Sequence, residues 1–437
     1  MNSGRLVAIA SALISLAALV IAVSEFEGIM TVIALFSLVF GSVASKRCSA
    51  KTNLFILAAA IATLACTVVS VVALGPEQMV DKDVMDKVHW FYVMGLLHAV
   101  PIVPMAFASF IIIASVTGAS YNWAVVGGLS PFVALGILVP GYVLEYVFQG
   151  IGDLLDDNGY ILYGLLVVTA VMLVFSWIFA RFLRRNRLIV TESGIAPLDC
   201  EPEPPAPVCR LTPSQDIRER RTALAVMVLA PVALMVICWF VVTGKAPGLA
   251  AGHPEEYLVA TCVLWALISL ILPILRLTRL VSLPSALVGI IYANIFFYVI
   301  CLTCGLYLNV SWCGDLGHVI SSTIVSTIVF VAICLIQTHS PSHVTFGSVD
   351  GFCAVLFLVA LSFGGIWEMM EGFTDTATGY SYMVYGATDT MGDLAADMIG
   401  VMIVTICAHV YLRNHDMAEI SCRVRLGRRS FETVETD

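Results

Sequence analysis

Six carboxylates lie within residues 367–397, although only 12% of the residues in the chain are charged. The segment reads WEMMEGFTDTATGYSYMVYGATDTMGDLAAD. Glu368 and Glu371 are three residues apart, and Asp389, Asp393 and Asp397 follow one another at steps of four. Side chains with these spacings lie on one face of a helix. The pattern therefore predicts two helices that each present a row of carboxylates.

An acid and a histidine with similar helical spacing, Asp315 and His318, precede this segment in the stretch CGDLGH. Carboxylates that lie close together in a low-dielectric setting repel one another unless a cation, protons or a histidine compensates them. Oxygen ligands with one imidazole suit Mg²⁺, Mn²⁺ or Ca²⁺, and also Zn²⁺ or Fe²⁺, so the identity of the metal stays open. We predict a divalent-metal site formed by Asp315, His318, Glu368, Glu371, Asp389, Asp393 and Asp397.

Three of these residues are candidate catalytic groups: His318, Glu368 and Asp393. Either the histidine or a carboxylate could act as a base while the cation polarises an oxygen. The alternative is that the acids are solvated caps, since Asp is common near helix N-termini. However, Asp397, Glu368 and His318 fall inside apolar stretches, where ionisable groups are costly and usually face a functional interior. This position favours a site over caps.

The elements that must hold these residues are membrane spans. The chain has 437 residues, 59% of them hydrophobic, and a mean hydropathy of +0.95. These values, with several apolar runs near twenty residues, predict an all-α polytopic integral membrane protein. The first span lacks a small-residue cleavage site and is expected to be an uncleaved helix. We predict about twelve transmembrane helices, at residues 5–23, 28–45, 54–74, 90–116, 122–147, 160–183, 222–243, 257–277, 282–304, 317–336, 350–371 and 394–412.

The charges in the loops predict the orientation of these spans. With the N-terminus in the cytoplasm, the basic groups around Lys46, Arg184, Arg218 and Arg276 all fall on the cytoplasmic side, whereas the opposite loops are acidic. Basic residues are enriched in cytoplasmic loops. The sequence therefore predicts a plasma-membrane protein with both termini in the cytoplasm and the acidic cluster outside. A miscounted span is the alternative, but it would mix basic and acidic loops on one side.

A Pro-rich, charged segment at residues 186–221 interrupts the hydrophobic pattern and predicts a flexible cytoplasmic linker. It separates an N-terminal membrane half, residues 1–185, from a C-terminal membrane half, residues 222–412, which carries the acidic site. A basic cytoplasmic tail follows at residues 413–437. Each half contains six predicted spans.

Short motifs suggest that the two halves are copies of each other. Residues 86 and 89 match Asp315 and His318 at an offset of 229, and Asp153 and Asp157 match Asp389 and Asp393 at 236. Because six spans return the chain to its starting side, such a duplication would be a parallel 6+6 repeat. Ile161 stands at the position that matches Asp397, so the front half is expected to be degenerate. Chance similarity of short acidic motifs is the alternative.

The motifs DLGH, WEMME and DTMGDLAADMIG, in this order within residues 312–412, resemble the YjdF-like family of uncharacterised bacterial and archaeal membrane proteins. They are more distantly similar to VanZ-like proteins, and the stretch DKVH at residues 86–89 fits that version. The resemblance implies an envelope-facing role but no settled reaction. The length of this chain and its front half depart from a compact family member.

Three functions follow from these observations. The first is a metal-dependent enzyme that acts on an envelope lipid or a lipid-linked head group, with the bilayer as partner. The second is a cation or small-solute transporter, and the third is a structural or regulatory membrane component. Nothing in the sequence points to a nucleic acid, and HExxH, GxSxG and P-loop motifs are absent. Cys304 and Cys313 flank an outer loop and could form a disulfide in an oxidising compartment.

The orientation can be tested by cysteine labelling in a background without native cysteines. A membrane-impermeant thiol reagent added outside the cell should modify Tyr380→Cys and leave Pro205→Cys unmodified, because these positions fall in outer and cytoplasmic loops. Labelling of Pro205→Cys alone would place the acidic cluster in the cytoplasm.

Overall fold

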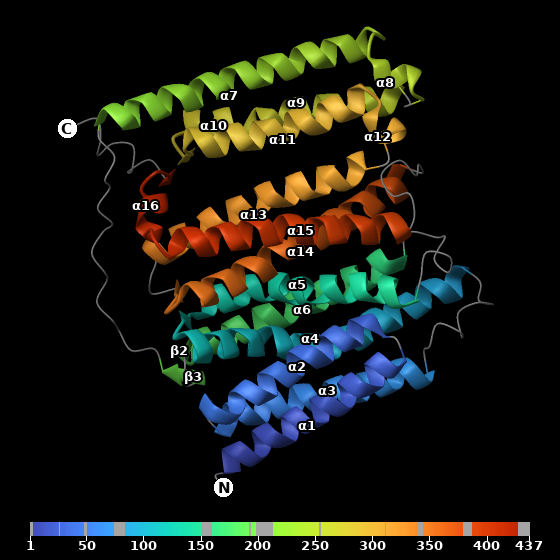
Figure 1. Ribbon diagram of the computed structural model, residues 1–437, viewed down its shortest axis with the longest axis vertical. Coiled ribbons are helices and arrows are strands. Elements are labelled where there is room, and N and C mark those ends of the chain that lie inside the picture. The colour runs from blue at the N-terminus through green and yellow to red at the C-terminus, as the bar shows by residue number, and fades with distance from the viewer. Residues whose placement is uncertain are drawn as a thin grey trace. The chain divides into compact units, whose positions relative to one another are not determined.

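The chain is almost entirely helical in the computed structural model, which describes residues 3–25, 27–47, 50–73, 84–149, 160–191, 194–197, 213–252, 255–310, 312–339, 344–378 and 387–426 (Figure 1). Within these residues, eleven helices are long and apolar enough to cross a membrane, and a shorter apolar helix covers Gly28–Ser42. Each of the twelve predicted spans therefore has a helical counterpart. The protein is an all-α polytopic membrane protein, as predicted.

The chain divides into two compact units that differ from the predicted halves. The first unit contains residues 1–204 and 339–413, and the second contains residues 205–338 and 414–437. The helices of the first unit are α1 (Ser3–Ser24), α2 (Gly28–Arg47), α3 (Ala50–Ala73), α4 (Val84–Thr117), α5 (Trp123–Gln149), α6 (Tyr160–Arg185), α14 (Val349–Thr378) and α15 (Ala387–Leu412). Helices α14 and α15 thus group with the N-terminal helices, and the duplication stays a prediction.

Four short strands of the first unit form an antiparallel sheet in the order β3 (Gly194–Pro197), β2 (Leu188–Thr191), β1 (Ser120–Tyr121) and β5 (Val344–Thr345). Tyr121 pairs with Val190 on one side and Val344 on the other. Its buried ring packs edge-on against Phe110 and Phe346. Part of the segment predicted as a linker is therefore a β-hairpin that joins the sheet, while residues 198–212 lie outside the described residues.

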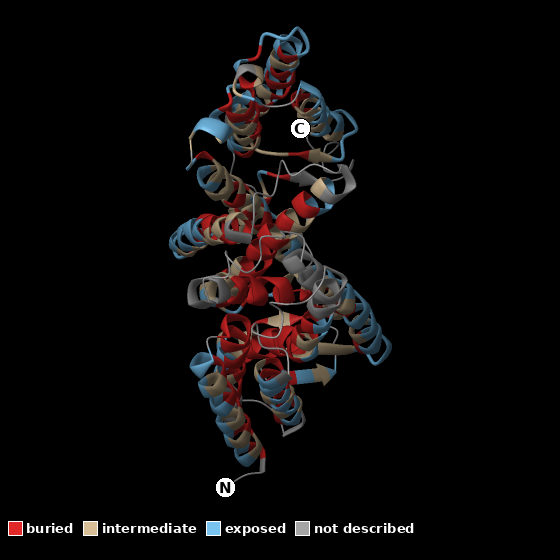
Figure 2. Cartoon of the chain, turned by 90° about the vertical axis from the view of Figure 1, so that its right-hand side faces the viewer, coloured by how far each residue is buried: buried red, intermediate tan, exposed pale blue. Residues whose placement is uncertain are grey.

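The centre of the first unit is formed by α4, α5 and α14. In their apolar spans 72%, 67% and 67% of the residues are buried, against 28% in the span of α1. In Figure 2 the buried residues are densest around this centre. An ideal Cβ at Gly136 of α5 would lie 2.0 Å from the carbonyl oxygen of Leu358 of α14, and the rings of Phe132 and Phe363 stack with centroids 5.4 Å apart. Helices α5 and α14 therefore touch backbone to backbone.

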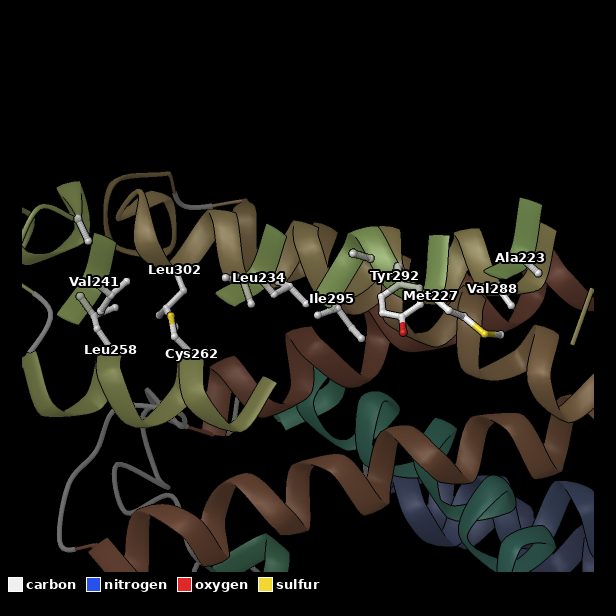
Figure 3. Close-up of a cluster of buried hydrophobic side chains, with 13 residues drawn as sticks. Ala223, Met227, Leu234, Val241, Leu258, Cys262, Val288, Tyr292, Ile295 and Leu302 are labelled. Carbon is white, nitrogen blue, oxygen red and sulfur yellow. The ribbon is translucent and has the colours of Figure 1, made fainter. Parts of the chain in front are cut away.

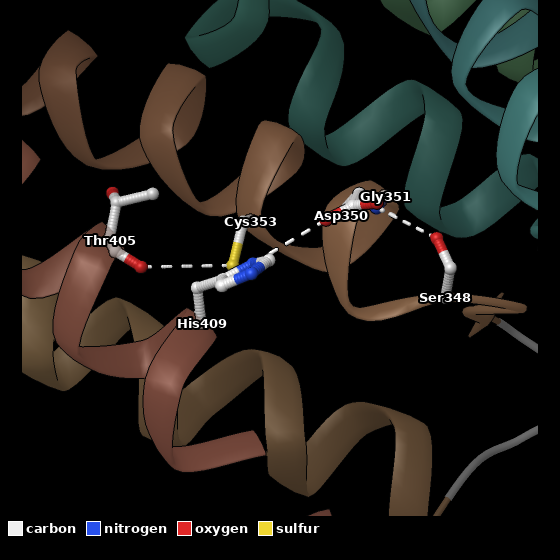
Figure 4. A network of polar contacts seen from close by, with 6 residues as sticks. All are labelled: Ser348, Asp350, Gly351, Cys353, Thr405 and His409. Carbon is white, nitrogen blue, oxygen red and sulfur yellow. Dashed lines mark hydrogen bonds and ion pairs between the residues drawn. The ribbon is translucent and has the colours of Figure 1, made fainter. Parts of the chain in front are cut away.

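Polar contacts join α14 to α15 near the start of α14 (Figure 4). His409 Nδ1 lies 3.4 Å from Asp350 Oδ1, and the Cys353 thiol donates to the carbonyl oxygen of Thr405 at 3.7 Å. The Ser348 hydroxyl accepts a hydrogen bond from the Gly351 amide in the first turn of α14. These contacts join the antiparallel pair at one end, and the predicted ligands of both helices lie toward the other end.

The second unit contains α7 (Pro213–Val242), α8 (Pro247–Ala250), α9 (Glu255–Ser269), α10 (Ile271–Leu277), α11 (Ser285–Thr303), α12 (Leu306–Asn309), α13 (Cys313–His339) and α16 (Met417–Ser421). Strand β4 (Val281–Ser282) pairs with β6 (Arg425–Leu426). Side chains of α7, α9 and α11, among them Leu234, Cys262 and Ile295, form its hydrophobic core (Figure 3). The Tyr292 hydroxyl is satisfied there by the carbonyl oxygen of Ser269 at 2.7 Å.

Two further features of this unit lie at the two ends of α13. Ser421 of α16 donates to the carbonyl oxygen of Cys334 at 3.3 Å, which ties α16 to the last part of α13. Cys304 and Cys313 are both free cysteines, the first exposed and the second buried, so the structure contains no disulfide between them.

The contact between α5 and α14 predicts a stability effect that can be measured on the purified protein. Gly136→Ala should lower the thermal unfolding midpoint and cost about 1–3 kcal/mol, because its methyl group would collide with the α14 backbone. The matched control is Gly128→Ala in the same helix, where a Cβ meets nothing within 4 Å. That variant should be neutral or slightly stabilising, since alanine favours helix by about 1 kcal/mol over glycine. Equal midpoints for the two variants would contradict the close contact.

Candidate metal centre

Three carboxylates of α14 and α15 come together in the first unit. They lie away from the end of the helix pair where Asp350 meets His409. Oxygen atoms of Glu368, Glu371 and Asp393 lie within 4.8 Å of one another. All three side chains are buried, with exposed fractions of 1%, 8% and 6%. We call these three residues the carboxylate cluster.

Helix geometry explains why these residues meet. Glu368 and Glu371 share one face of α14 because they are three residues apart. One turn before Glu368, Gly364 lies against Asp397 of α15, since an ideal Cβ at Gly364 would be 2.4 Å from Asp397 Oδ2. The two helices are antiparallel, so one turn forward on α14 corresponds to one turn back on α15. That step brings Asp393 opposite Glu368.

Asp397 lies one turn deeper than the carboxylate cluster and is 3% exposed. Its carboxylate occupies the space that a side chain at position 364 would need. Gly364 is therefore required for the position of Asp397, and sequence reasoning missed this role. The signal available was the pair Gly364 and Gly365 in the stretch SFGGIWEMME, one turn before the first glutamate.

Two neighbouring polar groups were also missed. The indole Nε1 of Trp367 donates a hydrogen bond to Glu371 Oε1 at 2.6 Å, and this contact fixes one oxygen of that carboxylate. Their spacing of four residues on a helix could have revealed the pair. Thr390 is 2% exposed, lies three residues before Asp393, and its hydroxyl has no hydrogen-bond partner among the described residues. Thr390 is thus a polar group on the cluster's face of α15.

Three further predicted ligands are Asp389, Asp315 and His318. Asp389 is half-buried in the first turn of α15. Asp315 and His318 belong to α13 of the second unit, where Asp315 is exposed and His318 is half-buried. His318 stays a predicted fourth ligand. Of the front-half matches, Asp153 and Asp157 lie outside the described residues, and the side chains of residues 86 and 89 do as well.

The arrangement of the carboxylate cluster fits a bound divalent cation. Two oxygens that bind one ion from opposite sides at about 2.1–2.5 Å are about 4–5 Å apart, which is the separation limit of this cluster. Three buried carboxylates that were all ionised would repel one another strongly without a positive charge. An all-oxygen donor set suits hard cations such as Mg²⁺, Mn²⁺ or Ca²⁺, and an imidazole would extend the choice to Zn²⁺ or Fe²⁺.

Comparison with known proteins gives a family match for part of the chain. Residues 225–414 match a family described as "Predicted membrane protein (DUF2238)". The match covers less than half of the 437 residues but contains all seven predicted ligands. No curated protein and no solved structure matches the chain. The comparison therefore supports the conclusion that this region belongs to a membrane protein and is similar to an uncharacterised membrane family.

The contact between Gly364 and Asp397 can be tested by a double-mutant cycle. Gly364→Ala should lower the thermal unfolding midpoint of the purified protein, because the methyl group and the Asp397 carboxylate compete for the same space. Most of this loss should disappear when Asp397→Ala is present, and the coupling should be about 0.5–3 kcal/mol. Strictly additive effects would show that the two residues do not touch.

Proposed function

We propose that the carboxylate cluster binds a divalent cation at the extracytoplasmic face of the membrane, with His318 as the predicted fourth ligand. The observation that carries this proposal is the approach of three buried carboxylate oxygens to within 4.8 Å in an apolar chain. The proposed orientation, with both termini in the cytoplasm of a plasma-membrane protein, rests on the distribution of basic residues among the loops.

We further propose that the protein is a metal-dependent enzyme acting on an envelope lipid or a lipid-linked head group. Glu368 lies seven residues before the end of its span at Asp375, and Asp393 lies four residues after the start of its span at Asp389. At 1.5 Å per residue, these positions are about 6–11 Å from the ends of the spans. This depth is close to lipid head groups, whereas transporter sites lie near the midplane.

The chemistry follows from the donor set. A bound cation would polarise a phosphoryl or carbonyl oxygen of the substrate. Trp367 holds Oε1 of Glu371 through its indole N–H, which orients that carboxylate. A carboxylate of the cluster, or His318, is then the candidate general base. The resemblance to YjdF-like and VanZ-like proteins agrees with an envelope-facing role and stays part of this proposal.

Metal binding can be tested on the purified protein with Mg²⁺, Mn²⁺, Ca²⁺ and Zn²⁺, by elemental analysis and by the shift of the thermal unfolding midpoint. Glu368→Gln and Asp393→Asn should each weaken binding by at least about tenfold, because each removes one charged ligand. Without added metal, the same variants should unfold at higher temperature than the native protein at neutral pH, since one repelling charge is gone.

The matched control is Asp157→Asn, the front-half counterpart of Asp393, which should leave bound metal unchanged. Equal losses from Asp157→Asn and Asp393→Asn would mean two working sites. A native protein that binds none of the four cations would overturn the proposal. Retention of full affinity in His318→Gln would restrict the site to the three carboxylates.

Assays in reconstituted vesicles distinguish the enzyme from a transporter and from a structural or regulatory component. Metal-dependent release of a head group from a lipid or lipid-linked substrate supports the enzyme. Cation or solute uptake without release identifies the transporter. Metal binding with neither activity identifies a structural or regulatory component.

A further inference from the structure

A second unusual polar group lies in the first unit, on helices that the proposed metal site does not use. His98 of α4 is 3% exposed, and neither of its ring nitrogens has a hydrogen-bond partner among the described residues. A neutral imidazole carries one donor and one acceptor. Burying both without partners is unfavourable, and an apolar residue would fill the same space at lower free energy. The position therefore indicates a ligand that supplies both partners.

The helices around His98 are interrupted by prolines. Pro101 and Pro104 lie inside α4, and Pro140 lies inside α5. A proline has no amide N–H to donate to the carbonyl four residues earlier, so the carbonyl oxygens of Leu97 and Val100 lose their usual helical donors. In a membrane span, such carbonyls are satisfied by neighbouring polar side chains or by ordered water. The α4 backbone next to His98 thus contains two carbonyl oxygens without their usual helical donors.

The α5 side of this region is also polar. Tyr142 follows Pro140 by two residues, is 5% exposed, and meets His98 edge-on with ring centroids 6.4 Å apart. One turn earlier, Val139 contacts the position of Gly365 on α14. Tyr142 and His98 therefore lie on α5 and α4 at about the level of Glu368.

The chemistry of these groups selects the ligand. It must donate to one imidazole nitrogen, accept from the other, and donate to a carbonyl oxygen. A metal cation is a poor fit, because no group of three His, Cys, Asp or Glu side chains surrounds His98 among the described residues. Water meets every requirement, and buried waters typically bind about three polar groups.

We propose that His98 marks a water-binding pocket between the proline-interrupted helices α4 and α5, inside the membrane span of the first unit. Water in the pocket would bind both imidazole nitrogens and the carbonyl oxygens of Leu97 and Val100. This hydration explains the presence of an ionisable residue at this depth. The residues that define this pocket are not those of the carboxylate cluster.

Cysteine accessibility tests the pocket in the full-length protein in a background without native cysteines. His98→Cys should react with Ag⁺ at least about tenfold faster than Ile102→Cys, because a hydrated ion that enters with water needs no local unfolding. Ile102 is the matched control, since it lies one turn further along α4 and is an apolar residue that is fully buried. Equal or undetectable rates at both positions would overturn the proposal.

Thermal unfolding provides an independent measurement if His98→Cys does not fold. His98→Leu should leave the midpoint unchanged or lower it, because a hydrated imidazole is already satisfied and leucine cannot bind the pocket water. A raised midpoint for His98→Leu would mean that the imidazole is dry and unpartnered, which would contradict the pocket.

Discussion

Mutual repulsion of buried carboxylates is the constraint on which the rest of the first unit depends. Glu368, Glu371 and Asp393 approach to within 4.8 Å although each is at least nine-tenths buried. Such an arrangement is unfavourable on its own, because each ionised group loses water and gains a like charge as neighbour. The helices that carry these groups must therefore be held together by contacts elsewhere. Those contacts are found along the length of α14, and they combine a polar pair, strand pairing and close backbone packing.

Three layers of contact hold α14 in place. At its start, the Asp350 and His409 pair and the sheet that includes β5 fix the helix to α15 and to the α4–α5 turn. In the middle, Gly136 lets the backbones of α5 and α14 touch. Next to the cluster, Gly364 admits the Asp397 carboxylate against the α14 backbone. Glycine serves both positions for the same reason, since any side chain would separate the helices. The acids are thus placed by contacts that lie elsewhere along α14.

The sequence predicted the parts of this structure that depend on local pattern. Hydropathy located the eleven helices that are long and apolar enough to cross a membrane, and the shorter apolar helix at Gly28–Ser42, because the bilayer imposes a characteristic length and composition on a span. Helical spacing grouped Glu368 with Glu371, and Asp393 with Asp397. The grouping of helices was not predictable in this way. Charge and motif patterns divided the chain at residues 186–221, whereas α14 and α15 pack with the N-terminal helices. Gly364, Thr390 and His98 were missed because their significance lies in what they contact across helices.

The packing of α14 gives the N-terminal helices a role that motif comparison alone did not suggest. The family match covers residues 225–414 and includes the whole carboxylate cluster. Yet α14 is buried in large part by α5, which lies outside the matched region, through Gly136 and the stacked pair Phe132 and Phe363. The helices that carry the site therefore rest on a scaffold that the match does not include. The N-terminal helices therefore contribute to the position of Glu368, because that position depends on the surface against which α14 packs.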